Sequence, residues 1–333
     1  MISSGKARPE GIRGDSGQVT DRMALAEPEP VSLSPIRAGL QAGATGRQRR
    51  RGRSRATLRR AALPILGAAI LLVVSLAAIV GPMLSPFDGY KQDLRGRLQP
   101  PGWADKTGAK HPFGTDQLGR DVFTRSLLGA RLSLLIGFVA VLGAGMLGTF
   151  LGLFAAYRGG LLDDLVMRLV DLQLALPMIL LALVIVALLG PSLRNVILVF
   201  VITGWPIFAR TARAATLSLR AEEFVVAARC IGCRDWRIVL SHVLPNAARA
   251  LIVIASFEVG KVIIYESSLG FLGMGVQPPT PTWGNMMGDG RAYLDTAWWL
   301  VLFPGLLLVL TAAAGNYIGD GLNELLDPRS KRV

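Results

Sequence analysis

The chain has 333 residues, of which 51% are hydrophobic and 18% are charged. Its apolar residues form repeated runs of about twenty, which is typical of membrane-spanning helices and excludes an ordinary soluble domain. The net charge of +13 would also suit a nucleic-acid binder. Eight arginines, however, lie within residues 47–60, directly before an apolar run and without a nucleic-acid-binding module. This placement favours a membrane surface over nucleic acid as the partner.

Residues 1–60 are rich in Gly, Ser, Pro, Ala and Arg and show no apolar periodicity, which predicts a disordered cytoplasmic tail. A secretory signal peptide is not expected, because the first apolar run starts far from the N-terminus and no small-x-small cleavage site follows it. The next region, 61–130, is predicted to hold the first transmembrane helix at 61–84 and then a polar extracytoplasmic segment from 87 to 130.

Five further apolar runs follow, each close to the roughly twenty residues needed to cross the hydrocarbon core. They are 131–156, 166–189, 196–215, 244–265 and 298–318. A short cytoplasmic tail is predicted at 321–333. The sequence therefore predicts an all-α integral membrane protein with six transmembrane helices.

An even number of spans places both termini on one side of the membrane. The arginine run and the basic C-terminal tail both indicate the cytoplasm, so the Arg-rich segment 217–242 is also expected inside. The region 87–130 disagrees, because it carries seven Lys or Arg residues yet must lie outside. We expect the N-terminal run to decide the orientation, since the strongest and earliest charge bias dominates.

Two pairs of glycines have the G-x-x-x-G spacing that lets membrane helices approach closely. They are Gly148 with Gly152, and Gly315 with Gly319. Glycine is frequent in membrane helices, so the spacing alone is a weak prediction of close packing.

The polar segment between the fourth and fifth runs is predicted to begin with a short amphipathic helix. Phe224, Ala228 and Ile231 recur at i, i+4 and i+7, on one helical face, and Gly232 permits the left-handed backbone that ends a helix. A second short helix is predicted over 235–243. Two such helices would fit a groove on a soluble partner, and helices lying on the lipid surface explain the pattern equally well.

Charged residues also fall inside or beside the predicted spans. Glu258 and Lys261 lie three residues apart within the fifth run and could pair. They either line a substrate route or form a structural ion pair, and the sequence leaves both open. For a substrate route, Lys261→Ala should lower uptake more than it lowers the assembled complex. Arg168 and Asp171, at the cytoplasmic end of the third run, are expected to pair as a helix-end anchor and not to contact the substrate.

No constellation of residues predicts catalysis or metal binding. The sequence has no G-x-x-x-x-G-K-[ST] phosphate loop and no H-E-x-x-H motif. Cys230 and Cys233 have C-x-x-C spacing, but zinc normally needs four ligands and the only histidines are His111 and His242. Ordinary small residues in a helical loop explain the cysteines better than a redox pair. We expect no catalytic residue, no metal site and no enzyme activity in this chain.

A longer pattern in the segment carries a family resemblance. Ala227-Ala228-x-x-x-Gly232, followed after nine residues by His242-x-Leu244-Pro245, resembles the permease signature of binding-protein-dependent ABC importers. Val226 and His242 depart from the general signature and are similar to its peptide-transport branch.

Three other segments resemble the second, C-type permease of dipeptide, oligopeptide or nickel importers. They are 111–121 with 129–133, 269–279 with 283–286, and 316–322 with 326–329. The resemblance covers about residues 61–329 and leaves out only the N-terminal tail. It implies a type I ABC importer permease fold, with the permease domain at 131–320 and a cytoplasmic coupling loop at 217–242.

The resemblance also implies the partners. These are a homologous second permease, two ATPase subunits, an extracytoplasmic substrate-binding protein, a peptide or similar solute, and the lipid of the bacterial inner membrane. No cofactor is expected on this chain, because ATP and Mg²⁺ would bind the ATPase subunits. The residues expected to couple the permease to the ATPases are Glu222, Glu223, Phe224, Ala227, Ala228, Gly232, Leu244 and Pro245.

Other functions are compatible with six spans. Within the family the solute could be nickel or another small molecule. Outside it, the chain could be a scaffold or receptor that signals without transporting, or an ion channel. The coupling-type loop, together with the absence of a soluble sensor or catalytic domain, favours the importer.

Overall fold

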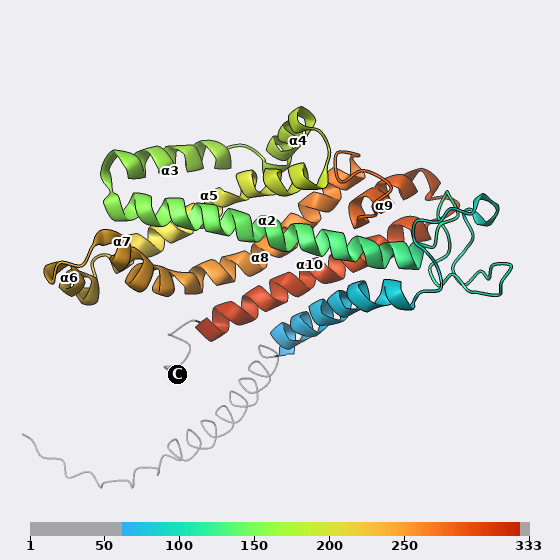
Figure 1. The fold of residues 1–333 in the computed structure, drawn as a ribbon, viewed down its shortest axis with the longest axis horizontal. Coiled ribbons are helices and arrows are strands. Elements are labelled where there is room, and N and C mark those ends of the chain that lie inside the picture. The colour runs from blue at the N-terminus through green and yellow to red at the C-terminus, as the bar shows by residue number, and fades with distance from the viewer. Residues whose placement is uncertain (1–61, 327–333) are drawn as a thin grey trace, which may run out of the picture. The chain divides into compact units, whose positions relative to one another are not determined.

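The computed structural model describes residues 62–326, and within this range the chain forms helices and isolated bridges but no strand (Figure 1). The long and short α-helices are Ala62–Leu84, α2 (Val122–Arg158), α3 (Gly160–Leu174), α4 (Met178–Leu189), α5 (Leu193–Leu219), α6 (Glu223–Cys230), α7 (Asp235–Ile238), α8 (Leu244–Phe271), α9 (Trp283–Gly290) and α10 (Trp299–Leu326). Short non-α turns are η1 (Leu94–Gly96), η2 (Val239–Val243) and η3 (Arg291–Tyr293). The predicted tail at 1–60 lies outside the described residues. Helix α10 continues past residue 321, where the sequence predicts a tail, to Leu326.

Four of the described helices are single, long and apolar enough to cross a membrane: Ala62–Leu84, α2, α5 and α10. The pair α3 and α4 makes a fifth if the two count as one span. Helix α8 has 28 residues but carries four charged residues, which keep it out of this group: Arg249, Glu258, Lys261 and Glu266. The all-α membrane class is confirmed, and the count of six remains a prediction.

The second span begins earlier than its hydropathy predicts. Helix α2 starts at Val122 and not at residue 131, and the side chain of Asp121 caps it by accepting a hydrogen bond from the backbone N–H of Thr124 at 2.7 Å. Its first turns contain polar residues, so an apolar run misses them. Arg131 lies inside the helix, and its side chain donates to the backbone carbonyls of Ala78 and Ile79.

The predicted third span, 166–189, is not one straight helix. It is broken between α3 and α4, whose axes differ by 93°. Pro177 stands at the break, where it lacks a backbone N–H and disfavours helical backbone at Leu176. The expected pair of Arg168 and Asp171 is also replaced, because Asp171 pairs with Arg210 of α5.

The core lies where α2, α5 and α8 meet, and it contains fully buried side chains such as Ile136, Phe200 and Leu269. Close packing at Gly148 and Gly152 is confirmed. A Cβ atom on Gly152 would lie 2.9 Å from the Cα atom of Ala209 in α5, and closer still to its carbonyl oxygen.

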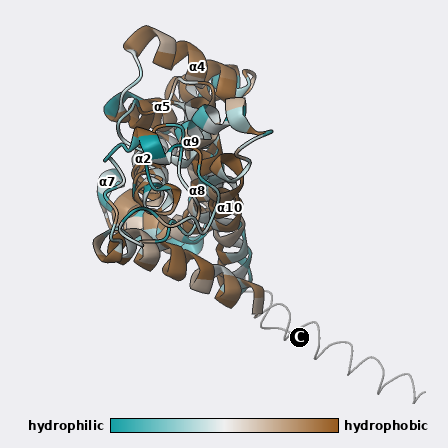
Figure 2. Ribbon diagram, turned by 90° about the vertical axis from the view of Figure 1, so that its right-hand side faces the viewer, coloured by the Kyte–Doolittle hydropathy of each residue, from teal (hydrophilic) through white to brown (hydrophobic). Residues whose placement is uncertain are grey.

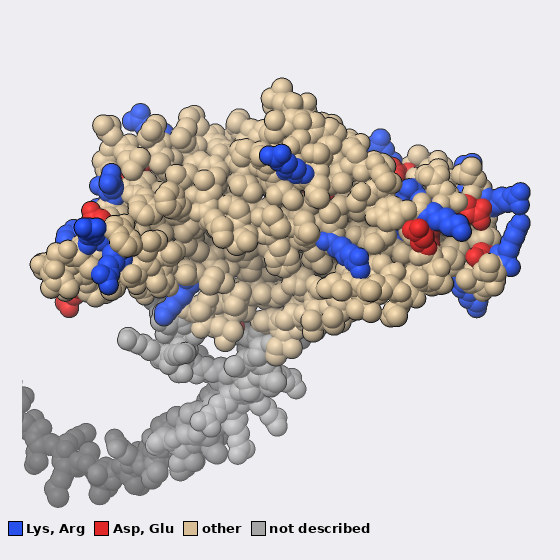
Figure 3. Space-filling view, viewed as in Figure 1, with Lys and Arg blue, Asp and Glu red and all other residues tan. Residues whose placement is uncertain are grey.

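Most residues of the long helices are hydrophobic (Figure 2), and many of their large apolar side chains are exposed, such as Leu142, Met146 and Leu188. Charged side chains gather near α6 and α7 at one end and near residues 85–121 at the other (Figure 3). This separation of apolar flanks from charged ends is typical of a protein that spans a bilayer.

The candidate coupling segment and intramembrane charges

The first short helix of the candidate coupling segment, residues 217–242, ends where the sequence predicts. Helix α6 spans Glu223–Cys230, and Gly232 adopts the left-handed conformation with φ +79°. The backbone N–H of Gly232 donates to Arg229 at 3.0 Å, and that of Cys233 donates to Ala228 at 3.1 Å. These bonds satisfy carbonyls at the helix end, which is the usual role of a glycine in this position.

The predicted apolar face of this helix is wrong in one respect. Ala228 is buried together with Val225, whereas Phe224 and Ile231 are 43% and 84% exposed. Helix α6 turns Val225 and Ala228 toward the core, so Ala228 packs inside the chain. Glu222, Glu223 and Ala227 are exposed, so they remain open to a partner.

Tyr157, at the end of α2, ties the segment to the helical core. Its hydroxyl lies 3.1 Å from Asp235 Oδ1, and it accepts a hydrogen bond from Arg229 at 3.1 Å. The Arg229 guanidinium also lies 5.4 Å from the centre of the Tyr157 ring. Hydrogen bonding to Tyr157 raises the pKa of Arg229. The contact couples residues far apart in sequence, which explains why no sequence pattern predicts it.

The second short helix differs from the prediction of one helix over 235–243. Helix α7 ends at Ile238 and continues through the π-turn η2 into α8. Pro245, in the first turn of α8, cannot donate a backbone hydrogen bond, which fits a wider preceding turn. Pro245 is exposed, and Leu244 is partly buried.

Glu258 and Lys261 form the ion pair that their spacing allows. Lys261 Nζ lies 2.6 Å from Glu258 Oε1. The Glu258 side chain is only 9% exposed, whereas that of Lys261 is 55% exposed. Tyr265 and Ser268, both partly exposed, continue the same side of α8 seven and ten residues after Glu258.

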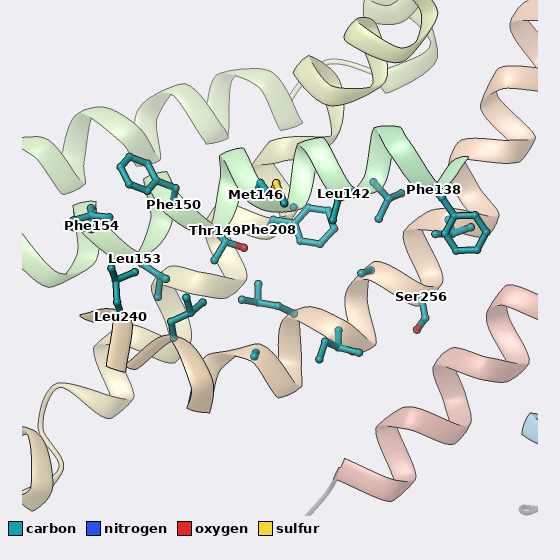
Figure 4. A pocket seen from close by; sticks show the side chains of 18 residues that line it. Phe138, Leu142, Met146, Thr149, Phe150, Leu153, Phe154, Phe208, Leu240 and Ser256 are labelled. Carbon is teal, nitrogen blue, oxygen red and sulfur yellow. The ribbon is translucent and has the colours of Figure 1, made fainter. Parts of the chain in front are cut away.

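An open cavity of about 570 Å³ lies on another side of α8, against α2 (Figure 4). Its lining is almost entirely apolar and includes Phe138, Met146, Phe208 and Leu251, with hydroxyl groups only at Thr149 and Ser256. This lining cannot compensate a buried charge. The cavity therefore has the chemistry of a surface for lipid or another apolar helix.

A smaller, more polar cavity of about 240 Å³ lies at the C-terminal end of α8. Its lining includes Gln277, Asn285, Asp289 and Arg291. Burial raises the pKa of Asp289, and Arg120 and Arg125 partly oppose this shift. Outside the spans, His111 Nδ1 lies 2.8 Å from Asp121 Oδ1.

No group of three residues that could hold a metal ion occurs between residues 62 and 326. Cys230 and Cys233 are both free thiols there, the first exposed and the second partly buried. The polar features of the described chain that bear on its function therefore include the exposed segment around α6, the ion pair between Glu258 and Lys261 in α8, and a polar cavity at the C-terminal end of α8.

Comparison with known families identifies this arrangement. The family model described as binding-protein-dependent transport system inner membrane component matches residues 148–332. The chain belongs to this family of transport permeases. A second model, the N-terminal transmembrane domain of oligopeptide transport permease C, matches residues 52–101. The predicted resemblance to this branch of permeases is confirmed.

Curated relatives of this permease are similar over most of its length. A dipeptide transport system permease protein of Alkalihalophilus pseudofirmus is 45% identical, over 82% of this chain and 88% of the relative. A di/tripeptide transport system permease protein of Pseudomonas aeruginosa is 42% identical, over 80% and 88%. One of Haemophilus influenzae, named for dipeptide transport, is 37% identical, over 80% and 91%.

Among solved structures, an inward-facing form of the MetNI methionine ABC transporter aligns with 60% of the permease and 94% of its own chain. The two are 20% identical and the TM-score is 0.49, which is too weak a likeness to support further conclusions.

Proposed function

We propose that this permease is one half of the translocation path of an ABC importer for di- and oligopeptides in the bacterial inner membrane. The observation that carries the proposal is its 37–45% identity, over about four fifths of its length, to permeases named for dipeptide transport. A homologous second permease completes the path. An extracytoplasmic binding protein delivers the solute to it.

Coupling to ATP takes place through α6 and its flanks. Two separate ATPase subunits bind ATP and Mg²⁺, and this chain hydrolyses nothing itself. Glu222, Glu223, Phe224 and Ala227 present exposed side chains to the ATPase surface, while Gly232 sets the direction in which the chain leaves α6. Leu244 and Pro245 pass the motion into α8. Ala228 contributes by packing α6 onto the core and not by touching the partner.

This function requires α6 and both termini to lie in the cytoplasm. We place Glu258 and Lys261 beside the route of the solute. A lipid-facing position would leave the half-exposed Lys261 ammonium in hydrocarbon, which is costly.

Nickel is the second candidate solute within the family, because the resembling branch includes nickel importers. The curated relatives that match about four fifths of this permease are named for dipeptide or di/tripeptide transport. This observation favours peptides.

The test is ATP-dependent uptake of labelled di- and oligopeptides by cells with intact protein or with Gly232→Pro. Proline cannot adopt φ +79°, and it removes the N–H that bonds Arg229, so it should disrupt the end of α6. We expect uptake to fall at least tenfold while the amount of complex in the membrane is unchanged.

Gly160→Pro is the matched control, because Gly160 is also left-handed, with φ +64°, and has open space around it like Gly232. It lies outside the segment and should retain uptake. If intact cells import no peptide, the peptide assignment is wrong. If both glycine variants lose uptake equally, the loss reflects general strain and the coupling role of the segment is refuted.

A further inference from the structure

Helix α8 carries a line of polar side chains along the C-terminal half of its length. Glu258, Lys261, Tyr265 and Ser268 are spaced at i, i+3, i+7 and i+10, which keeps them on one side of a helix. The side of α8 that faces away from this line is occupied, since Gly260 packs against Ala312 of α10 and Ile263 packs against Gly137 of α2. Ile264, beside Lys261, is exposed.

Lys261 cannot avoid the membrane interior by stretching toward a helix end. At about 1.5 Å per residue it lies roughly 15 Å from the nearer end of α8. A solvent-exposed ammonium at this depth requires water or a polar ligand beside it. The line of polar residues supplies a surface along which such a ligand can move.

The two members of the ion pair differ in accessibility, and this difference assigns their roles. Glu258 is buried, so its carboxylate is a fixed partner that holds the Lys261 ammonium in place. An ammonium has three donors, of which the 2.6 Å bond to Glu258 Oε1 uses one. The other two N–H groups belong to an exposed side chain and can donate to an anionic oxygen.

We infer that Lys261 binds the α-carboxylate of the peptide during translocation and that Glu258 positions its ammonium. The inference rests on the proposed function. Peptides of different sequence share their charged termini, so a carboxylate contact accepts any side chain. The nearby negative charge of Glu258 weakens the complex, which lets the solute leave the site.

The test compares initial uptake of a labelled dipeptide with that of its C-terminal amide, which lacks the carboxylate. Complete importers with their binding protein are reconstituted in proteoliposomes carrying wild-type permease, Lys261→Met, Lys261→Arg or the control Ile264→Met. Ile264 is exposed one turn further along α8, so its substitution places the same side chain on a neighbouring exposed position. The binding protein is identical in every sample, so its own preference cancels when acid-to-amide ratios are compared between variants.

We expect Lys261→Met to lower the acid-to-amide uptake ratio at least tenfold by slowing the acid alone. Lys261→Arg and Ile264→Met should keep the wild-type ratio within threefold. An unchanged ratio in Lys261→Met, or an equal fall in Lys261→Arg, overturns the inference.

If amide uptake is at background in every sample, the uptake of the free acid provides the test. Loss in Lys261→Met with retention in Lys261→Arg then supports the inference, and any other pattern refutes it. Failure of the proposed function is distinguishable, because wild-type importers would then transport neither peptide.

Discussion

The hydroxyl group of Tyr157 forms hydrogen bonds with Arg229 and Asp235 of the candidate coupling segment. Tyr157→Phe keeps the ring and removes these two hydrogen bonds. We expect the free energy of unfolding to fall by about 1 kcal/mol. We also expect ATP-dependent uptake to fall several-fold, because α6 then moves with less constraint relative to α2. Uptake rates and denaturant unfolding of the purified complex measure the two effects.

Tyr317→Phe is the control for this substitution. Within residues 62–326 no hydrogen bond is formed by the Tyr317 hydroxyl, and the residue lies in α10, away from the segment. It should change neither stability nor uptake. Equal uptake by wild type and Tyr157→Phe would show that the hydroxyl does not transmit motion.

At the scale of helices, the close approach of α2 and α5 depends on glycine. Gly152→Ala places a Cβ atom against the backbone of Ala209, which cannot yield as a flexible side chain can. We expect a loss of about 1–3 kcal/mol in unfolding free energy, typical of overpacking. Thermal unfolding of the complex provides the measurement.

Gly145→Ala makes the same chemical change on α2 with ordinary contacts. Its added Cβ would meet the Phe208 ring at 3.5 Å. This variant should therefore be as stable as wild type or slightly more so, because alanine favours helix. Equal destabilisation by both substitutions would mean that glycine matters here for another reason than the α2–α5 distance.

The break between α3 and α4 belongs to the same scale. The sequence contains its cause, Pro177, but hydropathy alone treats 166–189 as one run. The two halves are apolar on both sides of the proline, so composition conceals the 93° bend. Ion pairs from α3 to α5, such as Asp163 with Arg213 at 2.7 Å, then depend on which sides of the helices meet.

For the whole molecule, the orientation in the membrane can be tested with the native residues. The sequence has only two cysteines, both in the segment predicted to lie in the cytoplasm, and Cys230 is exposed. A membrane-impermeant thiol reagent should therefore label inside-out vesicles and leave intact cells unlabelled. The ATPase partners must be removed first, since they are expected to cover the segment.

The reverse pattern is expected of a protein with both cysteines replaced by serine and with Asp295→Cys. Asp295 is exposed near the opposite ends of α8 and α10. Labelling of Cys230 from outside intact cells would mean that the basic residues in 87–130 decide the orientation and that the N-terminal arginines do not.

Features that depend on neighbours along the chain can be predicted from the amino-acid order alone. Apolar runs indicated the membrane class, the i, i+3 spacing allowed Glu258 to pair with Lys261, and a glycine at 232 ended α6, because each depends on local backbone geometry. The family was also readable, since its signature is a contiguous pattern around Ala227 and Gly232.

Tertiary packing sets which sides of the helices meet. It turned Ala228 inward, placed Tyr157 under the coupling segment, paired Asp171 with Arg210 and left Lys261 exposed while it buried Glu258. Each of these outcomes depends on the rotation of one helix against another that is distant in sequence. That rotation is set by the packing of many side chains together, so no local pattern contains it.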